Sequence, residues 1–414
     1  MPAPTYIQVF EHQTLRVAEQ GLSERHLRAM AAFNERHGHR YFTTLHGKVR
    51  FHHYVGVLQV GDLCIEVLPK TDRHAEAAQW QQVLLQLLYH CGVLPHYTLS
   101  EASLRLQRSP LLLLYLDCFA DSIRDLLHVG LLKQYRQQDH NGPHWKGRIN
   151  FARQLQKNWR HPERVYSRRQ VYDYGHPAHQ VLSQALQAVL QTALPAGLRQ
   201  RFQHLERAFP KLPPRRVDEG LLQALLEQPQ LARYHRALEL ARLILLQYSP
   251  DVRVGQHHLL ALLFDMNQLF ERYLERQLQH HLDDSWTLRA QASRPFWANR
   301  RLRPDFWLQQ EQQHYILDAK WKILKRPEPS DADLRQMFAY NHSFQATKSV
   351  LIYPNVFALP PRQAPFAAPI LIDGQWQSHT CQVVFVDILN PKGQLNTKMA
   401  AQLMAQIQTP ILPS

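Results

Sequence analysis

The chain has 414 residues, 45% of them hydrophobic, so it can bury at least one full core and form two or three domains. Its longest strongly apolar run, Pro110 to Leu116, is far shorter than a membrane-spanning segment, so we expect a soluble protein. The net charge of +14, from 48 Lys and Arg against 34 Asp and Glu, favours a polyanionic partner.

The N-terminal sequence has neither the basic segment nor the apolar stretch of a signal peptide, so we expect a cytoplasmic protein. The 25 histidines include no HExxH spacing, and no metal role is assigned to them. The cysteines lie far apart without any CxxC pair, which disfavours a disulfide framework and a thiolate zinc site. They are Cys64, Cys91, Cys118 and Cys381.

The first 75 residues are predicted to form a small β-rich domain. A short strand at Tyr6 to Phe10 precedes a helix from Ser23 to about Arg36. Alternating apolar and polar residues from 55 to 68, around a Gly61-Asp62 turn, are typical of a β-hairpin.

Residues 76–250 are predicted to be mainly helical, because apolar residues recur at helical spacing from Glu76 to about Gln138. Further helices are expected at 177–193, 218–227, 231–248 and 259–282. Beyond Asp284 the pattern changes to strands around one clear helix at 331–342, which indicates an α/β domain at 251–414. The strand-like runs are 286–291, 301–309, 313–321, 348–353, 367–373 and 381–388.

Two acidic residues and a lysine are predicted to meet on one β-hairpin in this last domain. If its loop is Gln310 to Gln313, Asp305 and Asp318 face each other, with Lys320 on the same side. The opposite side carries the apolar residues, so one face is expected to be core and the other a site.

Carboxylates opposed in this way repel each other unless a cation or a proton lies between them. Mg²⁺ resolves the conflict and suits phosphodiester hydrolysis. Lys320 would position or deprotonate the attacking water and offset charge on the phosphate. The alternative is an ordinary hairpin whose acids pair with Arg303 and Lys320 at the surface.

Two flanking helices carry possible supporting residues. Gln336 and Tyr340 share a polar face, four residues apart, that can border the site or simply be solvated. Glu271 lies on the flank of the helix that precedes the hairpin, where it is either a third metal ligand or a solvated charge.

Several motifs follow one another in chain order. The first group is Val55-Gly-Val, Glu66-Val-Leu-Pro-Lys70 and Lys146-Gly-Arg148. The second group is Phe264-Asp-Met-Asn-Gln-Leu-Phe-Glu271, Arg303-Pro-Asp305, Asp318-Ala-Lys-Trp-Lys322 and Asp333-Leu-Arg-Gln-Met-Phe-Ala-Tyr340. Together these motifs resemble the McrC family, the nuclease subunits of modified-cytosine-dependent restriction systems, which have a PD-(D/E)xK endonuclease core.

The resemblance implies that Asp305, Asp318 and Lys320 are catalytic, that Mg²⁺ is the cofactor, and that the last domain has a central mixed sheet. It also implies a separate McrB-like AAA+ GTPase that recognises double-stranded DNA with modified cytosine. The residues before about 250 would dock onto that motor and stimulate it. The chain itself contains no GxxxxGK[ST] phosphate loop.

Two groups of basic residues are candidates for DNA binding. One leads into the hairpin, and no acidic residue interrupts it from 285 to 304. It comprises Arg289, Arg294, Arg300, Arg301 and Arg303. The second, within 146–169, includes Lys146, Arg148 and Lys157, and it can equally face the motor or remain solvated.

Two other functions remain open at this point. The chain can be a non-cutting adaptor that activates an AAA+ motor, or a stand-alone repair-type nuclease with the same core. The intact pair of acids favours catalysis.

Overall fold

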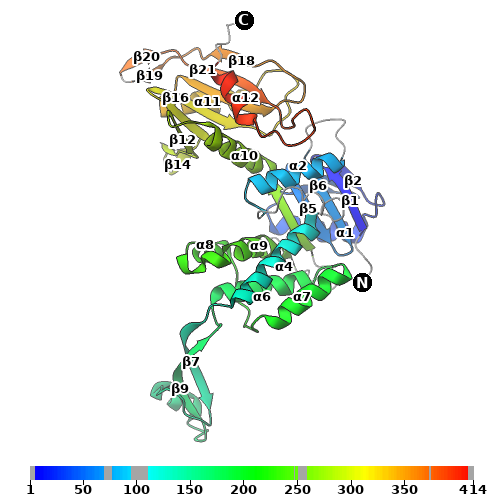
Figure 1. Ribbon diagram of the computed structural model, residues 1–414, viewed down its shortest axis with the longest axis vertical. Coiled ribbons are helices and arrows are strands. Elements are labelled where there is room, and N and C mark those ends of the chain that lie inside the picture. The colour runs from blue at the N-terminus through cyan, green and yellow to red at the C-terminus, as the bar shows by residue number, and fades with distance from the viewer. Residues whose placement is uncertain are drawn as a thin grey trace. The chain divides into compact units, whose positions relative to one another are not determined.

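The computed structural model describes residues 5–69, 77–94, 111–246, 248–249, 259–372 and 374–408. The chain forms two compact units, drawn in Figure 1. Unit 1 consists chiefly of Leu112–Leu262, and unit 2 chiefly of Tyr6–Leu58, Ile65–Leu111 and Leu263–Ser414. The predicted boundaries at 75/76 and 250/251, and Lys70 of the upstream motif, lie outside the described residues.

The β-rich start of the chain is confirmed. Ser23 caps α1 (Glu24–Arg36) by accepting a hydrogen bond from the His26 backbone, and Gly61 occupies the hairpin turn with φ of 60°. One sheet has the order β1 (Thr5–Phe10), β6 (Leu63–Leu68), β5 (Tyr54–Val60), β11 (Leu259–Asp265), β10 (Tyr248–Ser249). A smaller one has the order β2 (Thr14–Arg16), β4 (Lys48–Phe51), β3 (Phe42–Leu45).

Helices dominate the middle of the chain, as predicted. They are α2 (Ala77–His90), α4 (Leu111–Val129), α6 (Pro177–Leu190), α7 (Ala196–Ala208), α8 (Glu219–Leu226), the 3-10 helix η1 (Pro229–Tyr234) and α9 (His235–Leu246). The sequence pattern missed α7, which buries only Phe202 and Leu205. Phe202 stacks on Phe119 of α4, so this short apolar face still reaches the core of unit 1.

Two helix predictions are wrong in part. The helix expected to continue to Gln138 ends at Val129, and β7 (Gln134–Gly142) follows, because β7 pairs along its whole length with the distant β9 (Val165–Asp173). β8 (Arg148–Ile149) and α5 (Phe151–Asn158) complete this part. The helix expected at 259–282 begins only at Met266, since the continuous apolar run before it forms the buried strand β11.

The C-terminal part contains the expected mixed sheet. Its order is β12 (Trp286–Ala290), β15 (Phe306–Gln310), β16 (Gln313–Ala319), β17 (Lys348–Pro354), β21 (Thr380–Val386), β18 (Arg362–Pro365). The pairs β16–β17 and β17–β21 are parallel and the others antiparallel. β19 (Ile370–Ile372) and β20 (Gln375–Gln377) form a separate hairpin.

Three helices pack on this sheet. α11 (Asp331–Phe344) lies between β16 and β17 in the chain and contacts both strands. α10 (Met266–His281) and α12 (Met399–Gln408) contact each other, β16 and β21. Ile316, on the same side of β16 as Asp318, is fully buried under Met337 of α11. The prediction that the Asp318 face of the hairpin is a site rather than core is therefore wrong over most of that face. Only the end of β16 carries the polar residues of the site.

No helix among the described ranges combines the length and the apolarity needed to cross a membrane.

Candidate active site

The predicted hairpin register is confirmed. β15 and β16 pair from Gln310↔Gln313 to Phe306↔Leu317, which places Asp305, just before β15, opposite Asp318. Asp305 Oδ2 accepts a hydrogen bond from the Ala319 backbone N–H at 2.8 Å. The second carboxylate is therefore fixed against the end of β16, beside the first.

Lys320 joins this pair directly after β16. Its backbone N–H donates to the carbonyl of Ile352 at 2.8 Å, which extends the pairing with β17. Its Nζ lies 2.5 Å from Asp318 Oδ2 and donates to Gln336 Oε1 at 3.0 Å. The structure thus brings together the three residues predicted to be catalytic.

The two carboxyl groups are costly to ionise where they lie. Asp305 is 9% exposed and Asp318 is 2% exposed. Burial, followed by the charges of Asp318 and Glu271, raises the pKa of Asp305 to about 8. Burial also raises the pKa of Asp318, although Lys320 opposes this. A nearby cation would therefore stabilise both ionised forms.

Lys320 stays charged in this setting. Burial lowers its pKa, but the charges of Asp318 and Asp305 outweigh burial, and the net shift is upward. An ammonium held in place between buried acids is suited to stabilising negative charge more than to accepting a proton.

Gln336 and Tyr340 border the site, as the helix pattern allowed. The Gln336 amide donates to Tyr340 Oη at 2.8 Å and to Asp318 Oδ1 at 3.4 Å. Tyr340 in turn donates to the carbonyl of Arg303 at 2.9 Å. One face of α11 therefore holds Lys320, Asp318 and the segment that leads to Asp305.

Glu271 lies near the acids without joining them as a ligand group. Burial, then the charges of Asp318 and Asp265, raises the pKa of Glu271 to about 7. Within the described part of the chain, no three His, Cys, Asp or Glu side chains are gathered closely enough to hold a metal. The donors brought together are thus the carboxylates of Asp305 and Asp318. This set fits Mg²⁺, which commonly takes one or two carboxylates and completes its shell with water and phosphate oxygens.

Sequence reasoning missed Gln291 and Lys322. The side-chain amide of Gln291 donates to Asp305 Oδ1 at 3.4 Å. This contact depends on the pairing of β12 with β15, so no pattern in the neighbouring sequence predicts it. Lys322 donates to Asp333 Oδ1 at 3.1 Å, and the second lysine of the Asp318-to-Lys322 motif therefore binds the start of α11 rather than the two acids.

The five predicted arginines lie in different settings. Arg294 donates to the carbonyl of Ser343, and Arg301 donates to Ser293 Oγ at 2.6 Å, so both hold the chain in place. Arg289 lies over the Trp307 ring at 4.8 Å. Arg300 and Arg303 are exposed. Arg294, Arg300 and Arg301 belong to one hairpin, formed by the short strands β13 (Arg294–Trp297) and β14 (Arg300–Leu302).

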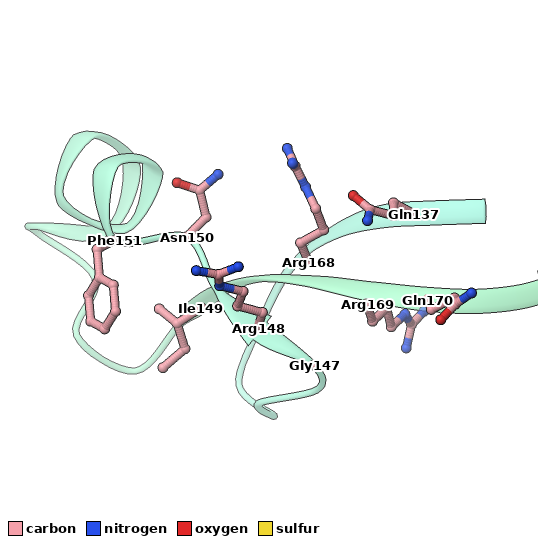
Figure 2. A pocket seen from close by; sticks show the side chains of 9 residues that line it. All are labelled: Gln137, Gly147, Arg148, Ile149, Asn150, Phe151, Arg168, Arg169 and Gln170. Carbon is pink, nitrogen blue, oxygen red and sulfur yellow. The ribbon is translucent and has the colours of Figure 1, made fainter. Parts of the chain in front are cut away.

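Part of the second basic group lines a pocket of about 640 Å³ in unit 1 (Figure 2). Arg148, Arg168 and Arg169 line it, and Lys146 and Lys157 are exposed residues of the same β7–β9 part of the chain. Gly147 has φ of 85°, and a Cβ there would lie 2.4 Å from the Arg168 carbonyl oxygen. This close approach gives the Lys146-Gly-Arg148 motif a physical reason.

A family model described as McrBC 5-methylcytosine restriction system component matches residues 49–354. The chain belongs to the McrBC family. This confirms the resemblance that the ordered motifs indicated, and the matched range includes the hairpin, Lys320 and α11.

Solved structures are similar to this McrBC chain. One is a chain of the Thermococcus gammatolerans assembly of McrB AAA+ hexamers with bound McrC, with a TM-score of 0.66 and 18% identity. That similarity covers 97% of this chain and 99% of the other, so the two share a fold. Another, in the cryo-EM structure of the Thermococcus gammatolerans McrBC complex, has a TM-score of 0.49, 17% identity and coverages of 66% and 87%. The comparison with curated proteins finds no match.

Proposed function

We propose that the chain is the nuclease subunit of a modification-dependent restriction complex, with a PD-(D/E)xK active site that hydrolyses DNA phosphodiester bonds. One observation carries the proposal: Asp305, Asp318 and Lys320 converge at the end of one hairpin, with both carboxyl pKa values raised. Membership of the McrBC family supports a role in restriction.

Asp305 and Asp318 would hold Mg²⁺, with Glu271 as a further candidate. The ion would supply Lewis-acid stabilisation of the charge that builds on the scissile phosphate. Lys320 Nζ contributes a fixed positive charge toward the same phosphate and orients a water by hydrogen bonding. Gln336 restrains Lys320 and Asp318 in the required arrangement through its amide.

The partner in this proposal is an McrB-like AAA+ GTPase that selects double-stranded DNA with modified cytosine. Support comes from the Thermococcus gammatolerans assembly, in which McrC is bound to McrB AAA+ hexamers. Docking onto this motor and stimulating it are assigned to residues before about 250. Arg289, Arg300 and Arg303 are proposed to contact DNA beside the acids, with Arg294 and Arg301 supporting them.

The test is DNA cleavage with Mg²⁺, GTP, methylated DNA and the AAA+ partner. Asp305→Ala is expected to abolish cleavage and leave stimulation of the GTPase intact. Asp284→Ala, which removes an exposed acid of the same unit, is the matched control and should cut normally. Cleavage by Asp305→Ala at the unsubstituted rate would refute the assignment and favour the adaptor alternative. Cleavage without any partner would favour a stand-alone nuclease.

A further inference from the structure

Two large aromatic side chains are exposed at the tip of the β13–β14 hairpin. Phe296 is 62% exposed and Trp297 is 67% exposed. A two-residue turn follows, with Ala298 at φ of 48°. The register shifts between Pro295 and Trp297, so that Phe296 is an extra residue at a bulge. Apolar rings at this position gain nothing for the fold, because they cover no core.

The base of the hairpin, in contrast, is firmly held. The Arg294 guanidinium lies 4.9 Å from the centroid of the Phe344 ring and donates to the carbonyl of Ser343 at the end of α11. Arg301 binds both the side chain and the carbonyl of Ser293, at 2.6 and 3.1 Å. Leu302 packs against the core cluster beneath α11. The tip therefore projects from a fixed base.

The hairpin is continuous with the candidate active site on both sides. Gln291, which precedes β13, donates from its backbone to the carbonyl of Asp305 at 2.9 Å. Arg303, which follows β14, accepts the hydrogen bond from Tyr340. A ligand that lies along this hairpin therefore extends to Asp305.

The charge around the tip identifies the class of ligand. Residues 285–304 contain five arginines and no acidic residue. The Arg300 guanidinium lies 5.7 Å from the centroid of the Trp297 ring, to which it is paired across the turn. Exposed aromatic rings flanked by arginines match the needs of nucleic acid, because the rings stack on bases while the cations bind phosphates.

We propose that Trp297 stacks on a base of the duplex DNA that extends from the active site along this hairpin and separates that base from its neighbour, while Arg300 binds the adjacent phosphate. The proposal rests on the nuclease function and adds to it a residue that distorts the bound DNA. Inserted apolar side chains are known to unstack and kink duplexes in this way.

The experiment uses a duplex with 2-aminopurine near the cut, whose fluorescence increases when the base loses its stacked neighbour. The protein is the full chain in an Asp305→Ala background, with and without the AAA+ partner. Binding should increase the fluorescence. Trp297→Ala should remove the increase and weaken DNA binding roughly tenfold, whereas Trp297→Phe should retain most of both.

Trp376→Ala is the matched control. Trp376 is 70% exposed on β20, in the β19–β20 hairpin. The sequence around this hairpin, from 363 to 391, contains no Lys or Arg. This variant should behave like the unsubstituted chain. A mismatch at the probed base should strengthen binding by the chain with Trp297 and not by Trp297→Ala, because a mismatched base is easier to unstack.

Equal fluorescence and affinity for Trp297→Ala and Trp376→Ala would overturn the role of Trp297. It is also overturned if the chain with Trp297 does not increase the 2-aminopurine fluorescence, either with or without the AAA+ partner. Loss of partner association alone in Trp297→Ala would make the tip a protein contact and would also overturn it. Cleavage by the Asp305-containing chain is measured in parallel. Absence of cleavage there contradicts the nuclease function, whereas normal cleavage with unchanged stacking contradicts only the role of Trp297.

Discussion

Asp139 on β7 and Asp318 on β16 are both acids beside cations on a strand, yet their surroundings differ sharply. Asp139 lies at the surface, where hydrogen bonding from Arg168, 2.9 Å away, lowers its pKa. Asp318 is buried beside Asp305, and Lys320 is the cation that offsets the charge of both acids. The pKa of Asp318 is raised. The charge of the first acid is compensated by its neighbours, whereas full ionisation of the buried pair requires a further cation.

Nearby charge alone does not mark a catalytic acid. Near Asp139, Arg153 and Arg168 both approach the one carboxylate, at 3.2 and 2.9 Å. Two cations therefore share one acid there, and in the hairpin two acids share one cation. The excess of negative charge in a buried place separates the candidate site from an ordinary surface ion pair.

The largest difference is expected between two single variants, Asp318→Asn and Asp139→Asn. The first should reduce cleavage by about 10³-fold or more, because it removes a charge that would hold the metal at the phosphate. The second should leave the cleavage rate unchanged, since its carboxylate binds Arg153, Arg168 and Tyr166 in the β7–β9 part of the chain. Rates are measured with Mg²⁺ and the AAA+ partner. Equal losses in the two variants would abolish the distinction between the acids.

Gln336→Ala should lower kcat by about 10- to 100-fold, the usual range when an outer partner of a metal-site residue is lost. The amide holds Lys320 Nζ at 3.0 Å, and Ala leaves this ammonium bound by Asp318 alone. Gln336→Glu should instead move the rise of the pH–rate profile to higher pH, because a third acid makes the first two harder to ionise.

Gln309→Ala is the control for this residue, since the Gln309 amide donates to the Glu311 carbonyl at 3.1 Å in the hairpin turn. It should leave both kcat and the pH profile unchanged. An unaltered pH profile in Gln336→Glu would show that Gln336 does not act through the two acids.

A pH-dependent stability should accompany the raised pKa of Asp305. The pKa rises from 3.8 to about 8, so between these values the folded state holds a proton that the unfolded chain has lost. This contribution to stability is complete below pH 4 and disappears as the pH rises through about 8. The Tm of the metal-free chain should therefore fall as the pH rises through this window. The Tm of Asp305→Asn should fall less over the same window.

Mg²⁺ supplies the reciprocal measurement. Because the metal and the proton compete for the same carboxylates, Mg²⁺ should bind more tightly at pH 8.5 than at pH 6.5 and should restore Tm most at high pH. Titration calorimetry at the two pH values measures this difference. Equal affinities would show that Asp305 does not hold the ion.

The hairpin of the candidate site could be predicted from sequence because its information is local. The polar turn between Gln310 and Gln313 sets the register, and the register alone brings Asp305 opposite Asp318. Lys320 follows from the same alternation. The contact of Gln291 with Asp305 could not be predicted, because it requires the pairing of β12 with β15 across a connection that itself folds into a hairpin.

The fold shows the same division between local and distant information. The helix at 331–342, which is α11, follows from local signals, and Ser330 caps it by accepting a hydrogen bond from the Asp333 backbone N–H. The start of β7, as far as Gln138, is predicted as helix, since its polar residues carry no strand signal and only the pairing with β9 makes it a strand. The burial of Ile316 under α11 likewise depends on where a helix that begins only at Asp331 packs.

The smallest effect is expected in the β7–β9 part, where basic residues outnumber acidic ones. Lys146, Arg148 and Lys157 are exposed, and Lys157 lies 5.8 Å from the centroid of the Tyr166 ring. If they bind DNA phosphates, replacing all three by Gln should weaken binding independently of sequence. The slope of log affinity against log salt should then fall by about 3.

Three exposed cations elsewhere, Arg28, Arg50 and Lys392, provide the matched triple substitution, which should leave the slope unchanged. An unchanged slope in the first triple, together with weaker association with the AAA+ partner, would assign this surface to the motor. The outcome separates two uses of positive charge. At a phosphate backbone each cation acts nearly independently by releasing counterions, whereas at a protein interface the loss depends on which partner acid is left unpaired.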